Sequence, residues 1–223
     1  MTVQQVVQEF VAHYPNAQSA GSARELALYN RVEAELAARY ALRVSQFEFP
    51  AMSVGETLFS AVPGANDIVN ILSCDWQESA AARPRPLEPY NIRRLDAEYP
   101  GWRRRDAARP QAFYVQPGLN GRVLGYWPRP PQDAAGMYPR LIVTAGIRRT
   151  CGLGDAIPDA MLDHAALVYG MCRLWAAQTD REMAEFWERQ YLVADQALGS
   201  YLTRYIDGDN DRIHIDVPGI RVV

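Results

Sequence analysis

The stretch that decides the fold covers residues 157–205, IPDAMLDHAALVYGMCRLWAAQTDREMAEFWERQYLVADQALGSYLTRY. Its apolar residues return every three or four positions, which is the spacing of one face of an α-helix. Pro158 suits the first turn of a helix, because the N–H that proline lacks would be unpaired there. Thr179 and Glu182 have the spacing of a capping box, so we expect a break near Gln178. The stretch therefore predicts two consecutive helices, the first beginning after Pro158.

The second helix of this pair carries a seam of aromatic side chains that is wider than one antiparallel partner helix requires. Trp187, Tyr191 and Tyr201 fall in this seam. Large aromatic side chains dominate both cores and interfaces. We therefore expect some of these rings to pack on N-terminal helices or on a neighbouring subunit, and we take the three as candidate interface residues.

Residues 1–43 predict two further helices. Thr2 and Gln5 have capping-box spacing before an apolar stripe, and Ser22 and Glu25 repeat the pattern before a second stripe. Pro15 stands between the two stripes. We expect the two helices to pair as an antiparallel hairpin.

From residue 44 the helical period disappears and short β-type runs take its place. These runs are 44–49, 57–62, 68–74, 112–116, 122–127 and 140–147. An Asn-Gly turn at 120–121 predicts a hairpin between the runs on either side of it. Ile92, Leu95 and Tyr99 have helical spacing and predict one short helix. Strands and helices do not alternate regularly, so we expect the strands to pair antiparallel.

Together these patterns predict the α+β class, with a helical body of an N-terminal helix hairpin and a C-terminal helix pair, and an inserted antiparallel β-rich domain. The expected boundaries are 1–43, 44–150, 151–206 and an extended tail at 207–223. Ile213, Ile215 and Val217 alternate along this tail as in a strand. An extended segment of this kind can add to the edge of a partner's sheet, so the three residues are also candidate interface residues.

Composition excludes some classes of protein. The chain of 223 residues has a net charge of -3 and a pI near 5.7, so its average surface does not indicate a polyanionic partner. All 23 basic residues are arginine, which either a GC-rich genome or a need for bidentate and stacked contacts would produce. Cys74, Cys151 and Cys172 are far apart, which indicates a reducing compartment. We expect no signal peptide and no membrane span.

We expect no catalytic residue, cofactor or metal, and therefore no enzyme. Asp207, Asp209 and Asp211 alternate as in a calcium loop, but the Gly and Glu that such a loop requires are replaced by Arg212 and Pro218. The glycines at 152 and 154 lack the third glycine of a phosphate-binding turn. The three histidines stand in separate regions and predict no metal site.

The most unusual local composition lies between residues 83 and 109. Its arginines are Arg83, Arg85, Arg93, Arg94, Arg103, Arg104, Arg105 and Arg109, and Tyr90, Tyr99 and Trp102 stand between them. One interpretation is a solvated loop in which the arginines pair with Asp96, Glu98 and Asp106. The others are a protein interface rich in arginine and aromatics or a surface facing nucleic acid.

Several phrases between residues 87 and 201 resemble the head-to-tail adaptor (connector) proteins of tailed bacteriophages, especially the short-tailed kind. The phrases are 92–96 (IRRLD), 108–114 (ARPQAFY), 124–130 (LGYWPRP), 141–145 (LIVTA), 157–158 (IP) and 165–170 (AALVYG). The resemblance implies a virion structural protein without catalytic residues. It implies a ring in the neck between head and tail, usually a dodecamer that matches the portal's twelvefold symmetry.

The implied partners are the portal protein, tail, nozzle or fibre proteins and further copies of the chain, with passing contact to packaged DNA. Such a protein is made in the host cytoplasm. Two other functions stay open. One is a nucleic-acid-binding packaging or regulatory protein that uses the arginines of residues 83–109. The other is an enzyme or sugar-binding module on a β-sandwich, motivated only by exposure of Tyr126 and Trp127.

Overall fold

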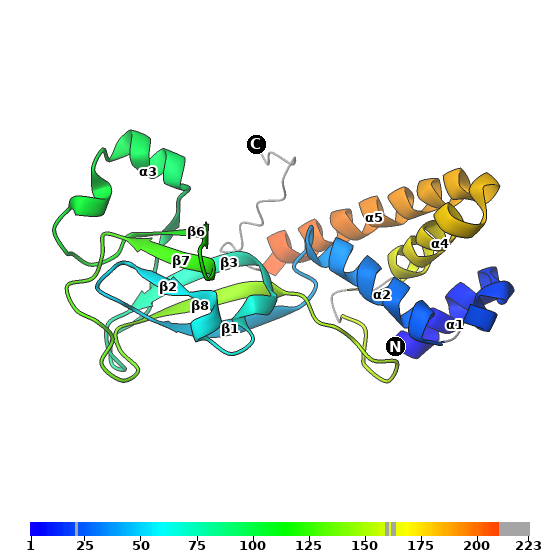
Figure 1. Cartoon of the computed structure of the whole chain (residues 1–223), viewed down its shortest axis with the longest axis horizontal. Helices are drawn as coiled ribbons and strands as arrows, with labels where there is room; N and C mark the ends of the chain where they lie inside the picture. The colour runs from blue at the N-terminus through cyan, green and yellow to red at the C-terminus, as the bar shows by residue number, and fades with distance from the viewer. Residues whose placement is uncertain (21, 159–160, 162–163, 210–223) are drawn as a thin grey trace. The chain divides into compact units, whose positions relative to one another are not determined.

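Helices at both ends of the chain and β-sheets in its middle make this an α+β protein, as the sequence predicted. The computed structural model describes residues 1–20, 22–158, 161 and 164–209. The chain divides into two compact units. The helical unit is formed by Met1–Arg43 together with Gly146–Val223, and the β-rich unit by Val44–Ala145. The β-rich unit is therefore inserted between two sequence segments of the helical unit (Figure 1).

Helix α1 (Val3–His13) begins where its cap residues predict. Gln5 Oε1 accepts a hydrogen bond from the Thr2 backbone N–H at 2.8 Å. The first N–H groups of a helix have no partner within the helix, and side chains near its start satisfy them. The buried face of α1 consists of Val3, Val6, Val7 and Phe10. A 3-10 helix, Pro15–Ala20, leads from α1 towards α2 (Ser22–Ala37).

Four helices contribute to the core of the helical unit: α1, α2, α4 (Ala165–Thr179) and α5 (Arg181–Asp209). Helices α2 and α4 approach one another closely at Gly170. A Cβ atom at Gly170 would lie 2.5 Å from Val32 Cγ1 and 3.2 Å from Tyr191 Cε2. No side chain fits there, so the glycine allows the two helices to pack at this distance.

The C-terminal helix pair exists, but its boundaries differ from the predicted ones. Helix α4 begins at Ala165 and not after Pro158. Between them, Met161 is buried and its backbone N–H donates to Pro158 O at 3.0 Å. A proline makes a first helical turn possible, but each helix must still meet the cost of nucleation. Burying Met161 needs no helix.

The break between α4 and α5 lies at Asp180. The Asp180 side chain accepts a hydrogen bond from Met183 N at 3.2 Å and caps α5, whereas Thr179 Oγ1 donates to Trp175 O at 2.9 Å. The predicted capping box is thus replaced by a cap one residue later. Helix α5 also continues to Asp209, although the sequence predicted that an extended tail begins at residue 207. Once a helix exists, each added residue gains a hydrogen bond without a new nucleus.

A network around Cys151 joins the two sequence segments of the helical unit. Asn30 on α2 accepts from Cys151 N at 2.7 Å and donates to Cys151 O at 3.1 Å. Glu33, also on α2, is buried and accepts from Arg43 Nε at 2.8 Å and from Cys151 Sγ at 3.4 Å. Arg43 in turn donates to Ala156 O at 2.9 Å. We call these residues the Glu33 network.

The β-rich unit contains two four-stranded sheets. The first has the order β1-β8-β3-β4 and the second the order β2-β7-β6-β5. Their strands are β1 (Val44–Pro50), β2 (Glu56–Leu58), β3 (Ile68–Gln77), β4 (Arg85–Pro86), β5 (Glu88–Pro89), β6 (Ala112–Gly118), β7 (Gly121–Trp127) and β8 (Arg140–Ile147). The predicted hairpin is confirmed, because β6 pairs antiparallel with β7 and Gly118 lies opposite Gly121.

Two predictions about the strands are wrong in detail. The strand expected at 57–62 is only Glu56–Leu58, because the chain turns into a 3-10 helix, Phe59–Ala61. Phe59 is buried there against Phe49, with ring centroids 5.6 Å apart. The pair β5–β6 is parallel and not antiparallel. Helix α3 (Ile92–Glu98), the predicted short helix, lies between these two strands in sequence and makes the parallel connection possible.

We predict that Gly170→Ala lowers the free energy of unfolding by about 1–3 kcal/mol, because the added methyl group overpacks the contact with Val32. The same change at an exposed position in a helix would stabilise it by about 1 kcal/mol. The sign of the change in the free energy of unfolding therefore tests the close approach of the two helices. Urea unfolding followed by circular dichroism measures that change. The control is Gly154→Ala, where no atom lies within 4 Å of the new Cβ. Equal effects of the two variants would contradict the prediction.

We further predict that Glu33→Gln destabilises the protein by about 2–3 kcal/mol, because it leaves the largely buried Arg43 guanidinium without its counter-charge. The matched control is Glu185→Gln, which removes one partner of a fully exposed pair with Arg189. We expect the control to change stability by less than about 0.5 kcal/mol. Thermal unfolding of both variants provides the measurement, and a neutral Glu33→Gln would show that the network does not hold the unit together.

Candidate interaction surface

The arginine-rich segment is positioned by the β6–β7 hairpin. Tyr114 on β6 lies directly opposite Gly125 on β7, and a Cβ atom at Gly125 would lie only 2.0 Å from Tyr114 Cζ. The Tyr114 ring therefore lies across the glycine. Its hydroxyl donates to Glu56 Oε1 at 3.0 Å, and its ring meets Trp102 edge-on with centroids 5.4 Å apart.

A small core attaches helix α3 and the 3-10 helix Trp102–Arg104 to this hairpin (Figure 1). Its buried members are Leu95, Trp102, Ala112, Tyr114 and Trp127. Asn91 caps α3 by accepting from Arg94 N at 2.7 Å, and Trp127 Nε1 donates to Trp102 O at 3.3 Å. The arginines of residues 83–109 thus project from a segment that is fixed by its own apolar residues.

Several of these arginines are held by neighbouring acids and rings. Arg94 donates to Glu98 Oε1 at 2.7 Å and lies 4.2 Å from the Tyr90 ring centroid. Arg103 donates to Asp96 Oδ1 at 3.0 Å and lies 4.3 Å from the Trp102 ring centroid. Planar guanidinium groups favour this combination of stacking and ion pairing.

Arg105 lies 5.4 Å from the Tyr99 ring centroid and 5.7 Å from that of Trp127. By contrast, Arg83, Arg85, Arg93 and Arg104 make no hydrogen bond, ion pair or ring contact to any described residue. Of the pairs that the solvated-loop interpretation requires, those with Asp96 and Glu98 are present. For Asp106 no such pairing is found among the residues that the structure describes.

The hydrogen bonds lower the pKa of two carboxyl groups on this surface. Asp96 accepts from Trp102 Nε1 at 2.8 Å, and this bond, followed by the contact with Arg103, holds the pKa of Asp96 below its usual value. The hydrogen bond from Arg94 lowers the pKa of Glu98 in the same way. Both carboxylates stay charged well into the acidic range, so the ion pairs persist at neutral pH.

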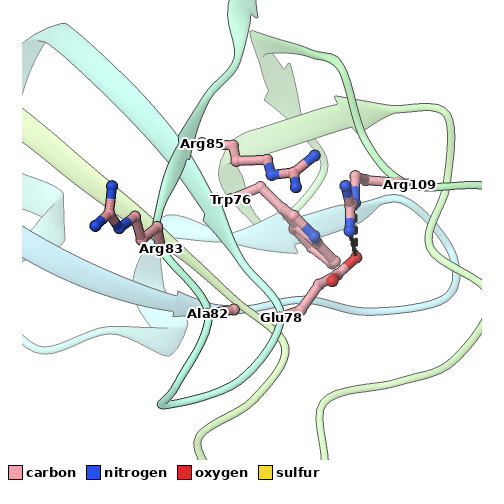
Figure 2. A pocket seen from close by; sticks show the side chains of 6 residues that line it. All are labelled: Trp76, Glu78, Ala82, Arg83, Arg85 and Arg109. Atoms are coloured by element: carbon pink, nitrogen blue, oxygen red, sulfur yellow. Dashed lines mark hydrogen bonds and ion pairs between the residues drawn. The ribbon is translucent and has the colours of Figure 1, made fainter.

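A pocket of about 270 Å³ opens at the end of the first sheet. Trp76, Glu78, Ala82, Arg83, Arg85 and Arg109 line it (Figure 2). Arg109 Nε donates to Glu78 Oε1 at 2.6 Å, and this bond lowers the pKa of Glu78. We call this the Trp76 pocket. The turn after β3 and the return of the chain at residue 109 bring Trp76, Glu78 and Arg109 together. No pattern in the sequence predicts this.

In the helical unit the aromatic seam of α5 faces inward. Trp187 is buried and packs on His13 of α1, with ring centroids 5.0 Å apart. Tyr191 is buried beneath Arg173, whose guanidinium lies 4.2 Å from its ring centroid. Tyr201 is half-buried against the same core. The sequence predicted that these rings pack either on the N-terminal helices or on a neighbouring subunit. Trp187 packs on the N-terminal helix α1, and its burial leaves little surface for a partner.

The exposed face of α5 carries apolar side chains that the sequence analysis did not select. Met183, Phe186, Leu192 and Val193 are exposed, Val193 at 66%. Met183, Phe186 and Val193 are spaced by three and seven positions and so lie on one side of the helix. The sequence did not predict them as interface residues because the helix is apolar on more than one side. Only the packing of the helix shows which side is buried.

Ile213, Ile215 and Val217, the tail residues expected at an interface, lie outside the described residues. The three cysteines are free and buried, and burial raises the pKa of Cys151 to about 11 and that of Cys172 to about 12. Among the described residues no group of three or more His, Cys, Asp or Glu side chains could hold a metal ion.

Tyr126 and Trp127 are buried, which removes the exposure that motivated a sugar-binding surface. No helix in the part of the chain that the structure describes is long and apolar enough to cross a membrane. In comparisons with known proteins, the chain matches no family model and no curated protein.

We predict that Trp102→Phe raises the pKa of Asp96 towards its usual value and does so more than Arg103→Gln, because the bond from the indole is the larger cause of the lowered pKa. A carboxyl group with a lowered folded pKa contributes stability above its unfolded pKa and loses it as pH falls through the folded pKa. Both variants should therefore reduce the pH dependence of stability in the acidic range. Carbon-detected NMR titration of Asp96 checks this, and a larger effect of Arg103→Gln would contradict it.

Proposed function

We propose that the protein is a head-to-tail adaptor of a tailed bacteriophage, a structural protein that forms a ring between the portal and the tail or nozzle components of the virion neck. The observation that carries the proposal is the presence of two chemically different candidate surfaces, one on each unit. The β-rich unit bears the arginines and aromatic rings of residues 83–109, such as Arg94 over Tyr90 and Arg103 over Trp102, which we call the arginine–aromatic surface. The helical unit bears the exposed apolar face of α5. A ring protomer needs two unlike faces, because only heterologous contacts close a ring.

The composition of the arginine–aromatic surface supports a protein partner. Arginine, tyrosine and tryptophan are enriched where proteins meet. Arg94 and Arg103 are already paired with Glu98 and Asp96, so their charges are balanced locally. Side chains that are held by neighbours before binding lose less conformational entropy on association. These features are typical of an interface that recognises shape more than charge.

The alternative is a nucleic-acid-binding packaging or regulatory protein. The observation that keeps it open is a set of arginines that make no hydrogen bond or ion pair to a described residue: Arg83, Arg85, Arg93 and Arg104. A gel shift with duplex DNA separates the two functions. Binding through phosphate contacts weakens steeply as salt rises, whereas an adaptor that meets DNA only in passing should show no retardation even at low salt.

The test of the adaptor function is electron microscopy of the purified chain mixed with the portal protein of the same virus. We expect closed rings that share the portal's symmetry. Val193→Asp should prevent ring closure, because a charge on the exposed face of α5 cannot be buried without a counter-charge. Gln8→Asp, at an exposed polar position of helix α1 and so outside this face, is the matched control and should assemble. Assembly of both variants, or of neither, would contradict the role given to this face, and the absence of any complex with the portal would overturn the proposed function.

A further inference from the structure

The Trp76 pocket has the groups of a binding site. Trp76 on β3 lies directly opposite Arg85 on β4 in the antiparallel ladder, so the two side chains extend from the same face of the sheet. Arg109 enters from a different part of the chain. Figure 2 shows Arg85 running alongside Trp76, Arg109 bonded to Glu78, and Arg83 extending away from Trp76.

The walls of the pocket are held in place by bonds that do not involve its arginines. Buried Gln77 donates from Nε2 to Ala82 O at 2.9 Å and accepts from Arg140 Nε at 3.0 Å, which shapes the turn between β3 and β4. On the other side, Ala108 N bonds to Arg129 O at 2.9 Å and Gln111 N to Trp127 O at 2.8 Å. Arg109 therefore projects from a segment anchored on both sides. A site with fixed walls binds at a smaller entropic cost.

The charges of the pocket indicate the ligand. The Arg85 guanidinium has no hydrogen bond or ion pair to a described residue, while Arg109 already holds a carboxylate of the protein's own, that of Glu78. A guanidinium fork binds a carboxylate or a phosphate through two parallel bonds. The Glu78 pair shows that a carboxylate is accommodated at this position.

We propose that the Trp76 pocket binds a carboxylate side chain from an acidic segment of a partner protein, with Arg85 as the principal ligand and Arg109 shared between that carboxylate and Glu78. The partner does not add a strand to the sheet. The edge strand β4 has proline on both sides of Arg85, at 84 and 86, and proline offers no N–H for pairing. Recognition therefore depends on side chains.

Nucleic acid fits the pocket less well. A base would have to stack on an open aromatic face, and Trp76 is only 4% exposed. A phosphate backbone presents closely spaced charges along a track of free cations, but Arg94, Arg103 and Arg109 are engaged with Glu98, Asp96 and Glu78. The Glu78 carboxylate inside the pocket would also repel a polyanion more than a single side chain.

The experiment uses the full chain with ¹⁵N-labelled tryptophan and follows the indole N–H resonance of Trp76, identified by its loss in Trp76→Phe. The probe is a hexapeptide of alternating Asp and Glu, blocked at both ends, and its counterpart of alternating Asn and Gln controls for contacts other than charge. We expect the acidic peptide alone to shift the resonance. Arg85→Gln should weaken binding about tenfold, as expected for one charge-assisted pair.

Two further variants test the assignment of roles. Arg85→Lys keeps the charge and loses the fork, so it should also weaken binding, which a purely electrostatic attraction would not predict. Glu78→Gln removes the internal competitor for Arg109 and should tighten binding about threefold, the scale of one exposed ion pair. The matched control is Arg93→Gln, which removes an exposed arginine outside the pocket and should leave the affinity unchanged.

Three results would overturn the inference: no shift of the Trp76 resonance, an equal loss of affinity in Arg93→Gln and Arg85→Gln, or an Arg85-dependent shift caused by duplex DNA and not by the peptide. The last result would assign the pocket to nucleic acid. Circular dichroism melting of each variant excludes unfolding as the cause of a loss. None of these measurements requires a ring or a portal, so the pocket and the adaptor function can fail independently.

Discussion

The Glu33 network joins the two sequence segments of the helical unit through groups that are buried or half-buried. The unit is assembled from two sequence segments that are separated by the whole β-rich insertion. Asn30 and Glu33 of the first segment bind the backbone and thiol of Cys151 in the second, and Arg43 reaches Ala156 O. Each of these groups would cost free energy if buried alone, and together they satisfy one another. The network therefore fixes the place where the chain re-enters the unit.

Arginine is used in the β-rich unit as a planar, stacking side chain. Arg94 lies over Tyr90, Arg103 over Trp102 and Arg105 near Tyr99 and Trp127. Lysine could supply the charge but not the flat surface or the fork. The absence of lysine from the chain is compatible with a genomic bias, but at these positions the structure shows a use for arginine that lysine would not serve. The result is a surface on which Glu98 and Asp96 balance part of the positive charge locally, while four further arginines make no ion pair to a described residue.

The sequence predicted elements better than it predicted their ends. The Asn-Gly pair at 120–121 predicted the β6–β7 hairpin, and in the structure Gly121, with φ of 116°, is the first residue of β7 and pairs with Gly118. The stripe of α1 specified its buried face. The errors lie where two local preferences compete. Pro158 permits a helix start, but the helix begins at Ala165. The run at 57–62 favours a strand, yet burial of Phe59 against Phe49 turns it into a 3-10 helix.

By itself, the sequence determined the α+β class, the two pairs of helices and the strand pattern between them, because periodicity and turn chemistry act over a few neighbouring residues. Only the tertiary structure decided which side of α5 is covered, with Trp187 inside and Val193 outside. Only it brought Trp76, Arg85 and Arg109 to one pocket. These features depend on contacts between residues far apart in the chain or on the exact path of a turn, and no local pattern records such distances.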